Sequence, residues 1–230
     1  MHELTVGSLF AGIGGFDAGF ERAGMRTVWF CEQDPFCQRV LAKHWPGVPV
    51  HDDVRALVAD AEPERCAELV AHESRGPGGG GGTQSACPIR FMRRRGAVVP
   101  VPVPYVDVLC GGFPCQDISN AGRGAGITGA RSGLWAEFAR LICELRPRYV
   151  VVENGAALRS RGLDVVLGDL AACGYDAEWD CIPASAVGAP HRRDRLWLVA
   201  YPPGGGRERR PQRAGGDRPG GQGGDFAALA

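Results

Sequence analysis

A cysteine in a turn rich in glycine and proline is the first residue of this chain that could do chemistry. Cys115 lies in the segment Gly111-Gly112-Phe113-Pro114-Cys115-Gln116, directly after the apolar stretch 105–110. Such a turn holds its side chains rigidly and leaves them partly exposed. Only the thiolate form of cysteine attacks, so a nucleophilic Cys115 needs a positively charged neighbour or a proton acceptor. A buried structural cysteine is the alternative interpretation.

Two groups further along the chain could serve such a nucleophile. Glu153 and Asn154 end the apolar stretch 149–152, and burial beside its valines can raise a carboxyl pKa so that the group carries a proton at neutral pH. Arg193 and Arg195 precede the last apolar stretch and could contact an anion or a base. The alternatives are a solvated strand end for the first pair and a solvated turn for the second.

A glycine-rich turn near the start of the chain has the features of a ligand site. Phe10-Ala11-Gly12-Ile13-Gly14-Gly15 follows a predicted strand and begins a predicted helix, and its glycines let the backbone approach a ligand closely. Glu32-Gln33, after the next strand, would suit a ribose diol, and Asp53 follows the third strand. The spacing differs from the dinucleotide fingerprint G-x-G-x-x-G, so a tight structural turn is the alternative.

These groups need elements that carry them to one place. The hydrophobic pattern predicts alternating strands and helices, with strands over 4–10, 27–31, 48–51, 105–110, 149–152, 177–182 and 196–200, and helices over 16–23, 35–44, 54–70, 134–145 and 163–173. Such alternation predicts a doubly wound, mostly parallel α/β sheet of Rossmann-like type. Ligands of such sheets lie at the carboxyl ends of the strands, where Glu32, Asp53, Cys115 and Glu153 converge.

Composition sets further limits. Of 230 residues, 44% are hydrophobic and 23% charged, which excludes wholesale disorder, and the net charge of zero gives no global attraction to nucleic acid. We expect one domain over 1–202 with a flexible insert at 74–104 and a disordered Gly/Arg/Pro-rich tail over 203–230. No signal peptide or membrane span is visible, and the nine cysteines form no Cys-x-x-Cys pair. We therefore expect a cytoplasmic protein with reduced thiols and no metal.

Together these motifs resemble those of the DNA (cytosine-5)-methyltransferases. The residues that carry the resemblance are Ser8 to Gly15, Glu32 and Asp53, Asp107 to Gln116 with Ser119, Gly122, Arg131 and Leu134, Glu153-Asn154, and Ala184 to Arg195. Gly155 replaces the family's valine after Glu-Asn, and His191 replaces its usual glutamine. The resemblance covers residues 4 to about 201, apart from the insert.

The resemblance implies an S-adenosylmethionine-dependent methyltransferase domain that methylates C5 of cytosine in double-stranded DNA, on a base flipped out of the helix. By this resemblance Cys115 bonds covalently to C6, Glu153 contacts or protonates N3, and Arg193 and Arg195 hold the base and the active-site loop. Gln116, Ser119 and Asn154 would form the substrate loop. The cofactor would contact Phe10, Gly12, Gly14, Gly15, Glu32, Gln33, Asp53 and Pro114.

Family members usually carry a target-recognition domain and two final motifs, which this sequence does not show. Three hypotheses follow: half of a split, bacterial or phage-encoded enzyme whose partner chain brings target recognition; an inactive cofactor-binding remnant or regulatory module; and an RNA cytosine-5 methyltransferase. A nicotinamide dehydrogenase is disfavoured, because it would not need Cys115, Glu153 and Arg195 in this order.

Overall fold

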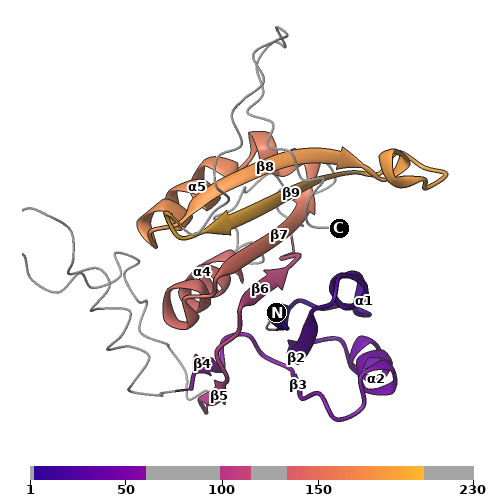
Figure 1. The fold of residues 1–230 in the computed structure, drawn as a ribbon, viewed down its shortest axis with the longest axis vertical. Coiled ribbons are helices and arrows are strands. Elements are labelled where there is room, and N and C mark those ends of the chain that lie inside the picture. The colour runs from indigo at the N-terminus through magenta and orange to yellow at the C-terminus, as the bar shows by residue number, and fades with distance from the viewer. Residues whose placement is uncertain (1–2, 61–98, 115–133, 205–230) are drawn as a thin grey trace, which may run out of the picture.

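A seven-stranded sheet forms the centre of the molecule. The structure, a computed structural model, describes residues 3–60, 99–114 and 134–204. In the sheet the strand order is β3-β2-β1-β6-β7-β9-β8, and the strands are β1 (Thr5–Leu9), β2 (Arg26–Cys31), β3 (Val50–His51), β6 (Val108–Gly111), β7 (Tyr149–Gly155), β8 (Asp176–Pro183) and β9 (Asp194–Tyr201). The predicted α/β class is confirmed (Figure 1).

The sheet is mostly parallel, but strand β9 runs in the opposite direction to its two neighbours. The neighbours from β3 to β7 pair in parallel, whereas β9 pairs antiparallel with both β7 and β8. Gly155, at the carboxyl end of β7, therefore lies opposite Arg195, near the start of β9. The reversal brings the beginning of β9 to the edge where the parallel strands end.

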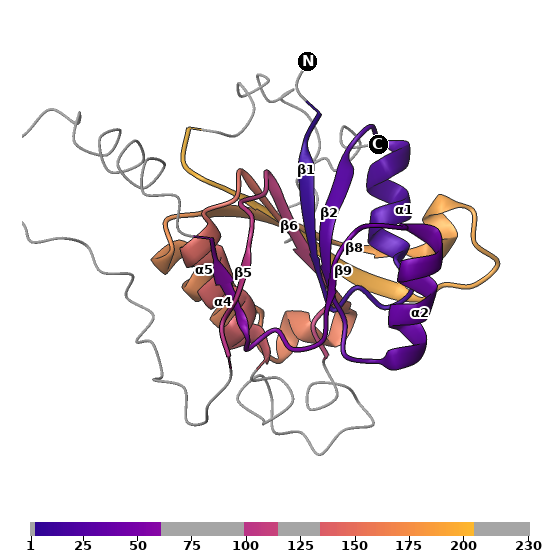
Figure 2. The ribbon, with the colours of Figure 1, turned by 90° about the horizontal axis from the view of Figure 1, so that it is seen from below.

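Helices cover the sheet from both sides (Figure 2). The α-helices are α1 (Gly15–Arg22), α2 (Pro35–His44), α4 (Leu134–Leu145) and α5 (Leu163–Ala172), and the 3₁₀ helices are η2 (Ala156–Ser160) and η3 (Ala184–Val187). Helices α4 and α5 pack on one face and form the main core, to which α4 contributes Trp135, Phe138, Ala139, Leu141, Ile142 and Leu145. The opposite face carries α1 and α2 and a smaller core.

The helix starts follow from local chemistry. The Asp34 carboxylate caps α2 by accepting hydrogen bonds from the backbone N–H groups of Phe36 (2.7 Å) and Cys37 (3.2 Å), and Pro35 occupies the first turn. Helix α1 instead begins after Gly14, whose φ of 86° is left-handed. A Cβ at Gly14 would lie 2.4 Å from the Trp45 ring, so only glycine fits there.

A buried polar cluster ties α1 to the sheet. The fully buried carboxylate of Asp17 accepts hydrogen bonds from the hydroxyl groups of Ser8 (3.0 Å) and Thr27 (2.9 Å), on β1 and β2. Burial raises the pKa of Asp17 above its ordinary value, although both hydroxyl donors act in the opposite direction. This cluster fixes the helix that begins at the glycine turn.

Two predicted segments differ from the structure. The helix predicted over 54–70 is wrong where the structure describes it, because Leu57–Ala59 form strand β4. The insert predicted as flexible over 74–104 contains strand β5 (Val101–Val103), which pairs in parallel with β4 in a separate two-stranded sheet. Leu57 and Val103 are fully buried against the core under α4, and this burial overrides the local pattern. Residues 61–98 and 205–230 lie outside the described residues.

The expectation of reduced thiols also needs correction. Cys143 on α4 and Cys173 after α5 form a disulfide, with 5.7 Å between their Cα atoms. Spacing along the sequence gives no sign of this pair, because the packing of α4 against α5 brings the residues together. Cys31, Cys37, Cys110 and Cys181 are free thiols. Among the described helices, none is long and apolar enough to cross a membrane.

Substitution of Asp17 tests the buried cluster. Asp17→Ala should lower the free energy of unfolding by about 1–3 kcal/mol, because two buried hydroxyl groups lose their acceptor. The raised pKa means that ionisation of Asp17 opposes folding, so wild-type stability should fall as pH rises through that pKa. Asp17→Asn, which keeps an acceptor oxygen, should lack this loss. Urea unfolding of the three proteins over a series of pH values, beginning below the ordinary carboxyl pKa, provides the measurement. An Ala variant as stable as the wild type would contradict the assignment.

Candidate active site

The sequence-predicted site residues that the structure describes lie along one edge of the sheet. Along the shared registers Leu9 pairs with Gly111, and Gly111 pairs with Val152. The end of β7 therefore lies at the same edge of the sheet as the turns that follow β1 and β6. Strands β2 and β3 end beside them, since the backbone N–H of Glu32 donates to the His51 carbonyl at 2.8 Å.

The glycine turn after β1 is held to the first acidic residue. Phe10 and Gly12 have positive φ angles of 53° and 56°. The N–H of Gly12 donates to Glu32 Oε2 at 2.7 Å, while Glu32 Oε1 accepts the N–H of Asp34 at 2.8 Å. A Cβ at Gly12 or Gly15 would meet no atom within 4 Å, which leaves open space above the turn. An open glycine turn beside a fixed carboxylate fits the ribose end of a nucleoside-type cofactor.

A second carboxylate lies beside the first. Asp53 follows β3 and forms an ion pair with Arg55, with 2.9 Å between the Arg55 Nε and the Asp53 Oδ1. Burial raises the pKa of the Cys31 thiol to about 12, with further contributions from the charges of Asp53, Glu32 and Asp52. Gln33 follows Glu32 and is exposed. Glu32 and Asp53 thus follow the ends of two paired strands, since Cys31 of β2 lies opposite His51 of β3.

The other half of the site contains a partly buried ion pair. Arg195 Nε lies 2.7 Å from Glu153 Oε1, and the two side chains are 27% and 24% exposed. Burial raises the pKa of Glu153 above its ordinary value, while Arg195 and Arg193 act in the opposite direction. Arg193 is exposed between η3 and β9, with a positive φ of 23°. Glu153 is therefore a carboxyl group that takes up a proton more readily than an exposed glutamate.

Asn154 positions the turn that leads to the predicted nucleophile. Its side chain is 3% exposed, donates from Nδ2 to the Phe113 carbonyl at 3.1 Å and accepts the N–H of Gly155 at 2.8 Å. The Phe113 ring also packs on Trp135 of α4, with 5.3 Å between ring centroids. Pro114, half-buried, is the last described residue of this turn. Cys115, Gln116 and Ser119 lie outside the described residues.

Gly112 has a role that sequence reasoning missed. A Cβ at this position would lie 2.8 Å from Glu153 Oε2, so the carboxylate occupies the space that a side chain would need. The Gly-Gly pair before Phe113 was a visible signal, but the sequence does not show which side chain lies against it. The site thus needs glycine at 112 to keep Glu153 in place.

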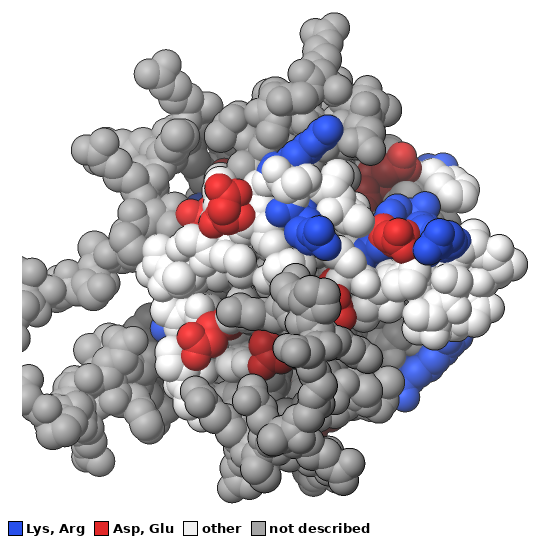
Figure 3. Space-filling model, turned by 90° about the horizontal axis from the view of Figure 1, so that it is seen from above, with Lys and Arg blue, Asp and Glu red and all other residues white. Residues whose placement is uncertain are grey.

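Charge on the outer side of β8 and β9 is mixed. Seen from that side, the described acidic and basic side chains are interspersed (Figure 3). This agrees with the net charge of zero. Any attraction of these described residues to phosphate is therefore local.

Comparison with known families agrees with this geometry. The model of the C-5 cytosine-specific DNA methylase family matches residues 4–66 and 94–208. The chain belongs to this family. The matched range includes the glycine turn, Glu32 and Asp53, the Pro114-Cys115 turn, Glu153 and Arg195, so the recognition made from the motifs is confirmed.

Curated relatives are bacterial Type II methyltransferases. The methylase chain is 30% identical over 205 residues to M2.BsuMI of Bacillus subtilis, covering 86% of this chain and 42% of that protein. It is 28% identical over 203 residues to M.DsaV of Dactylococcopsis salina, covering 86% and 46%. The chain thus spans less than half the length of these two relatives.

Solved structures share the fold. The S. pombe Dnmt2 methyltransferase superimposes with a TM-score of 0.57 at 16% identity, covering 87% of the methylase chain and 51% of the Dnmt2 chain. At this level of identity the likeness concerns the fold alone. It supports the Rossmann-like arrangement of a methyltransferase domain.

Gly112→Ala tests the placement of Glu153. The φ of Gly112 is not in the left-handed region, and Glu153 Oε2 is the end of a flexible side chain, so the methylase should still fold. Displacement of the carboxylate should lower methyl transfer to DNA, measured in the complete enzyme, by roughly 10²-fold or more, as for loss of a positioned acid–base group.

Gly168→Ala on α5 is the matched control, since a Cβ there meets nothing within 4 Å. It should leave transfer unchanged. Cofactor affinity and the unfolding midpoint report whether the Gly112→Ala variant has a wider defect. Full transfer by that variant would show that Glu153 can move without consequence.

Proposed function

We propose that this chain is the catalytic part of a methyltransferase that moves a methyl group from S-adenosylmethionine to C5 of cytosine in DNA. The main support is the shared edge of the sheet. Glu32 and Asp53 follow strands that end at this edge, where the Gly112–Pro114 turn and the Glu153–Arg195 ion pair also lie. We assign Glu32 and Asp53 to the cofactor, and Glu153, whose carboxyl pKa is raised by burial, to proton transfer. The Type II relatives are bacterial, which favours a bacterial or phage-encoded DNA-modification enzyme of the cytoplasm.

The cofactor residues follow from the first half of the site. Glu32 would accept from the ribose hydroxyls, Asp53 from the adenine amine, and the turn at Gly12, Gly14 and Gly15 would lie against the rest of the molecule, with Phe10, Gln33 and Pro114 at its borders. When bound, S-adenosylmethionine supplies an electrophilic methyl group. Glu32 is already oriented by its bonds to the N–H groups of Gly12 and Asp34, so little ordering would accompany binding.

The reaction needs a nucleophile, because cytosine C5 is itself a poor one. The Cys115 thiolate would add to C6, and the electron pair of the C5–C6 double bond would then be available at C5. Cytosine C5 takes the methyl group, loses its proton to a base, and the C6–S bond breaks to release Cys115. The target base must first leave the helix stack.

Glu153 and the arginines would assist this addition. A protonated Glu153 could donate to cytosine N3 and so prevent negative charge from building up on the ring, for which its raised pKa is suited. Arg195 would hold the Glu153 carboxyl in position, and Arg193 would contact the base or a phosphate. Asn154 would fix the turn before Cys115, while Gln116 and Ser119 would belong to the substrate loop.

Methyl transfer with labelled S-adenosylmethionine and unmethylated double-stranded DNA tests the proposal. We expect the chain, together with the part that supplies target recognition, to label DNA. Cys115→Ser should abolish labelling while cofactor affinity stays within about twofold, because the thiol acts only on the base. Transfer retained by Cys115→Ser would remove the nucleophile assignment. Cofactor binding without transfer under any condition would favour an inactive binding module, and labelling of RNA but not DNA would favour the RNA-directed alternative.

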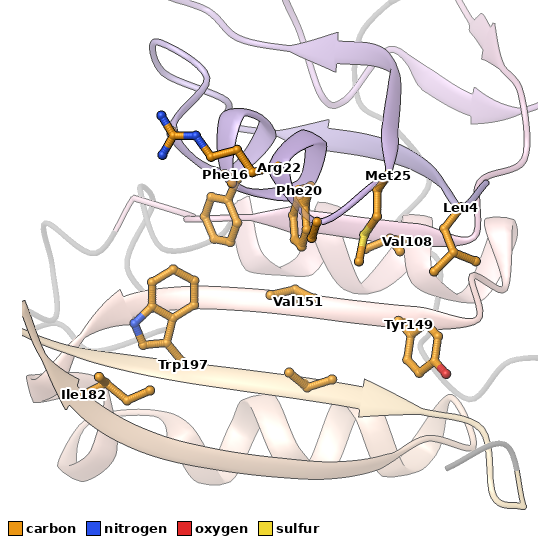
Figure 4. Close-up of a pocket in the computed structure, with 14 residues that line it drawn as sticks. Leu4, Phe16, Phe20, Arg22, Met25, Val108, Tyr149, Val151, Ile182 and Trp197 are labelled. Atoms are coloured by element: carbon orange, nitrogen blue, oxygen red, sulfur yellow. The ribbon is translucent and has the colours of Figure 1, made fainter. Parts of the chain in front are cut away.

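A second part of the proposal concerns a partner chain that supplies target recognition. The face of the sheet that carries α1 leaves an apolar groove of about 550 Å³. Phe16 and Phe20 of α1 point across it toward Trp197 and Val151 of the sheet, and Met25 and Tyr149 continue the lining (Figure 4). A sheet in this class of fold buries both faces, so the groove favours an additional apolar helix, which we assign to the partner chain.

A charge placed in the groove tests this assignment. Phe20→Glu should abolish any increase in methyl transfer that the product of the neighbouring downstream reading frame brings, because a carboxylate opposes burial of the groove. Phe36→Glu is the matched control, since Phe36 is an exposed phenylalanine on α2 outside the groove. Equal stimulation of both variants, or no stimulation of the wild type, would contradict a partner in this groove.

A further inference from the structure

Helix α4 carries a charged triad that the proposed reaction does not use. Arg140 Nε lies 2.8 Å from Glu137 Oε2, and Arg140 Nη1 lies 2.8 Å from Glu144 Oε1. The arginine side chain is only 11% exposed. Helical spacing of three and four residues places all three side chains on one stripe of α4. Burying a guanidinium this far is costly unless each of its donors has a partner, so the triad is more than a surface ion pair.

The triad extends from α4 to the turn that follows β3. Arg140 Nη2 donates to the carbonyl of Val54 at 3.2 Å, and Glu144 Oε2 accepts the N–H of Ala59 at 3.4 Å. Val54 is the neighbour of Asp53 and is itself buried in the core under α4. One arginine therefore fixes both its own helix face and the backbone next to an acid of the site. A planar guanidinium can do this because its N–H groups point in several fixed directions.

The same helix supports the other parts of the site. Trp135 packs on Phe113, before the Pro114-Cys115 turn, with 5.3 Å between ring centroids. Phe138 packs on Phe10 of the glycine turn, with 6.4 Å between centroids. Both of these contacts are apolar and involve no hydrogen bond. The bond from Arg140 to Val54 is the directional contact among them, so it can set the position of the Asp53 turn relative to the rest.

We propose that Arg140 is a positioning residue that holds the turn of Asp53 in place for the adenine end of the cofactor. The inference rests on the proposed function, because that proposal assigns Asp53 to the adenine amine. Loss of the arginine would free the carbonyl of Val54 and leave Glu137 and Glu144 without their cationic partner. Asp53 would then meet the cofactor less often in its binding position, and cofactor affinity would fall.

Calorimetric titration with S-adenosylhomocysteine tests this role without requiring the complete reaction. For the full chain, Arg140→Met should weaken binding about tenfold. Arg140→Lys keeps the charge but loses the planar guanidinium with its several N–H donors, so its affinity should lie between that of Arg140→Met and that of the wild type. Arg146→Met is the matched control. Arg146 is also a half-buried arginine that donates to a backbone carbonyl, that of Cys173, but it lies between α4 and β7, away from the site. It should lower the unfolding midpoint without changing affinity.

A double-mutant cycle separates positioning from general stability. If Arg140 acts through Asp53, Arg140→Met should cost little affinity in the Asp53→Ala background, although it costs about tenfold in the wild type. Equal costs in both backgrounds, or unchanged affinity of Arg140→Met, would overturn the inference. Absence of binding by the wild-type chain would instead overturn the cofactor assignment on which the inference rests.

Discussion

The ion pair between Glu153 and Arg195 sets the main constraint on this structure. A carboxylate at the end of β7 is partly buried, so it needs a partner, and the nearest strand supplies one only because β9 runs antiparallel. The same carboxylate occupies the space beside Gly112, so a larger residue at this position of the turn after β6 would displace it. Strand direction, glycine placement and the raised pKa of Glu153 are therefore consequences of keeping one acidic group at this edge of the sheet.

Helix α4 provides the common support for the two halves of the site. Its apolar face fills the core against the sheet, and its first turns contact the turns after β1 and β6 through Phe138 and Trp135. Its charged stripe reaches the turn after β3 through Arg140. Three turns that are distant in sequence thus lie against one rigid element. Close packing of this kind transmits a shift at one turn to the others, which suits a site whose cofactor and target base must meet.

The sequence correctly predicted those helices whose bounds depend on the local pattern of residues. The bounds predicted for α2 and α4 agree with the structure, because Asp34 with Pro35 marks one start and a periodic apolar stripe defines the other helix. It could not identify what depends on packing between distant segments. Strands β4 and β5 pair only because Leu57 and Val103 are buried under α4, and the Cys143–Cys173 disulfide requires α4 and α5 side by side. The predicted strand ends placed Glu153 at this edge, whereas its pairing with Arg195 depends on the antiparallel register of β9, and the role of Gly112 depends on where the Glu153 side chain lies.

The two faces of the sheet differ in a way that bears on how the chain folds and acts. The face under α4 and α5 buries a continuous core that extends from Leu9 to Ala200. The α1 face leaves Phe16, Phe20 and Trp197 half-exposed around the groove. Helix α1 begins at the glycine turn and is fixed from below by Asp17, so any helix docked in the groove would press on the element that carries the cofactor cradle. A partner on this face would thereby act on cofactor binding, because the glycine turn assigned to the cofactor leads directly into α1.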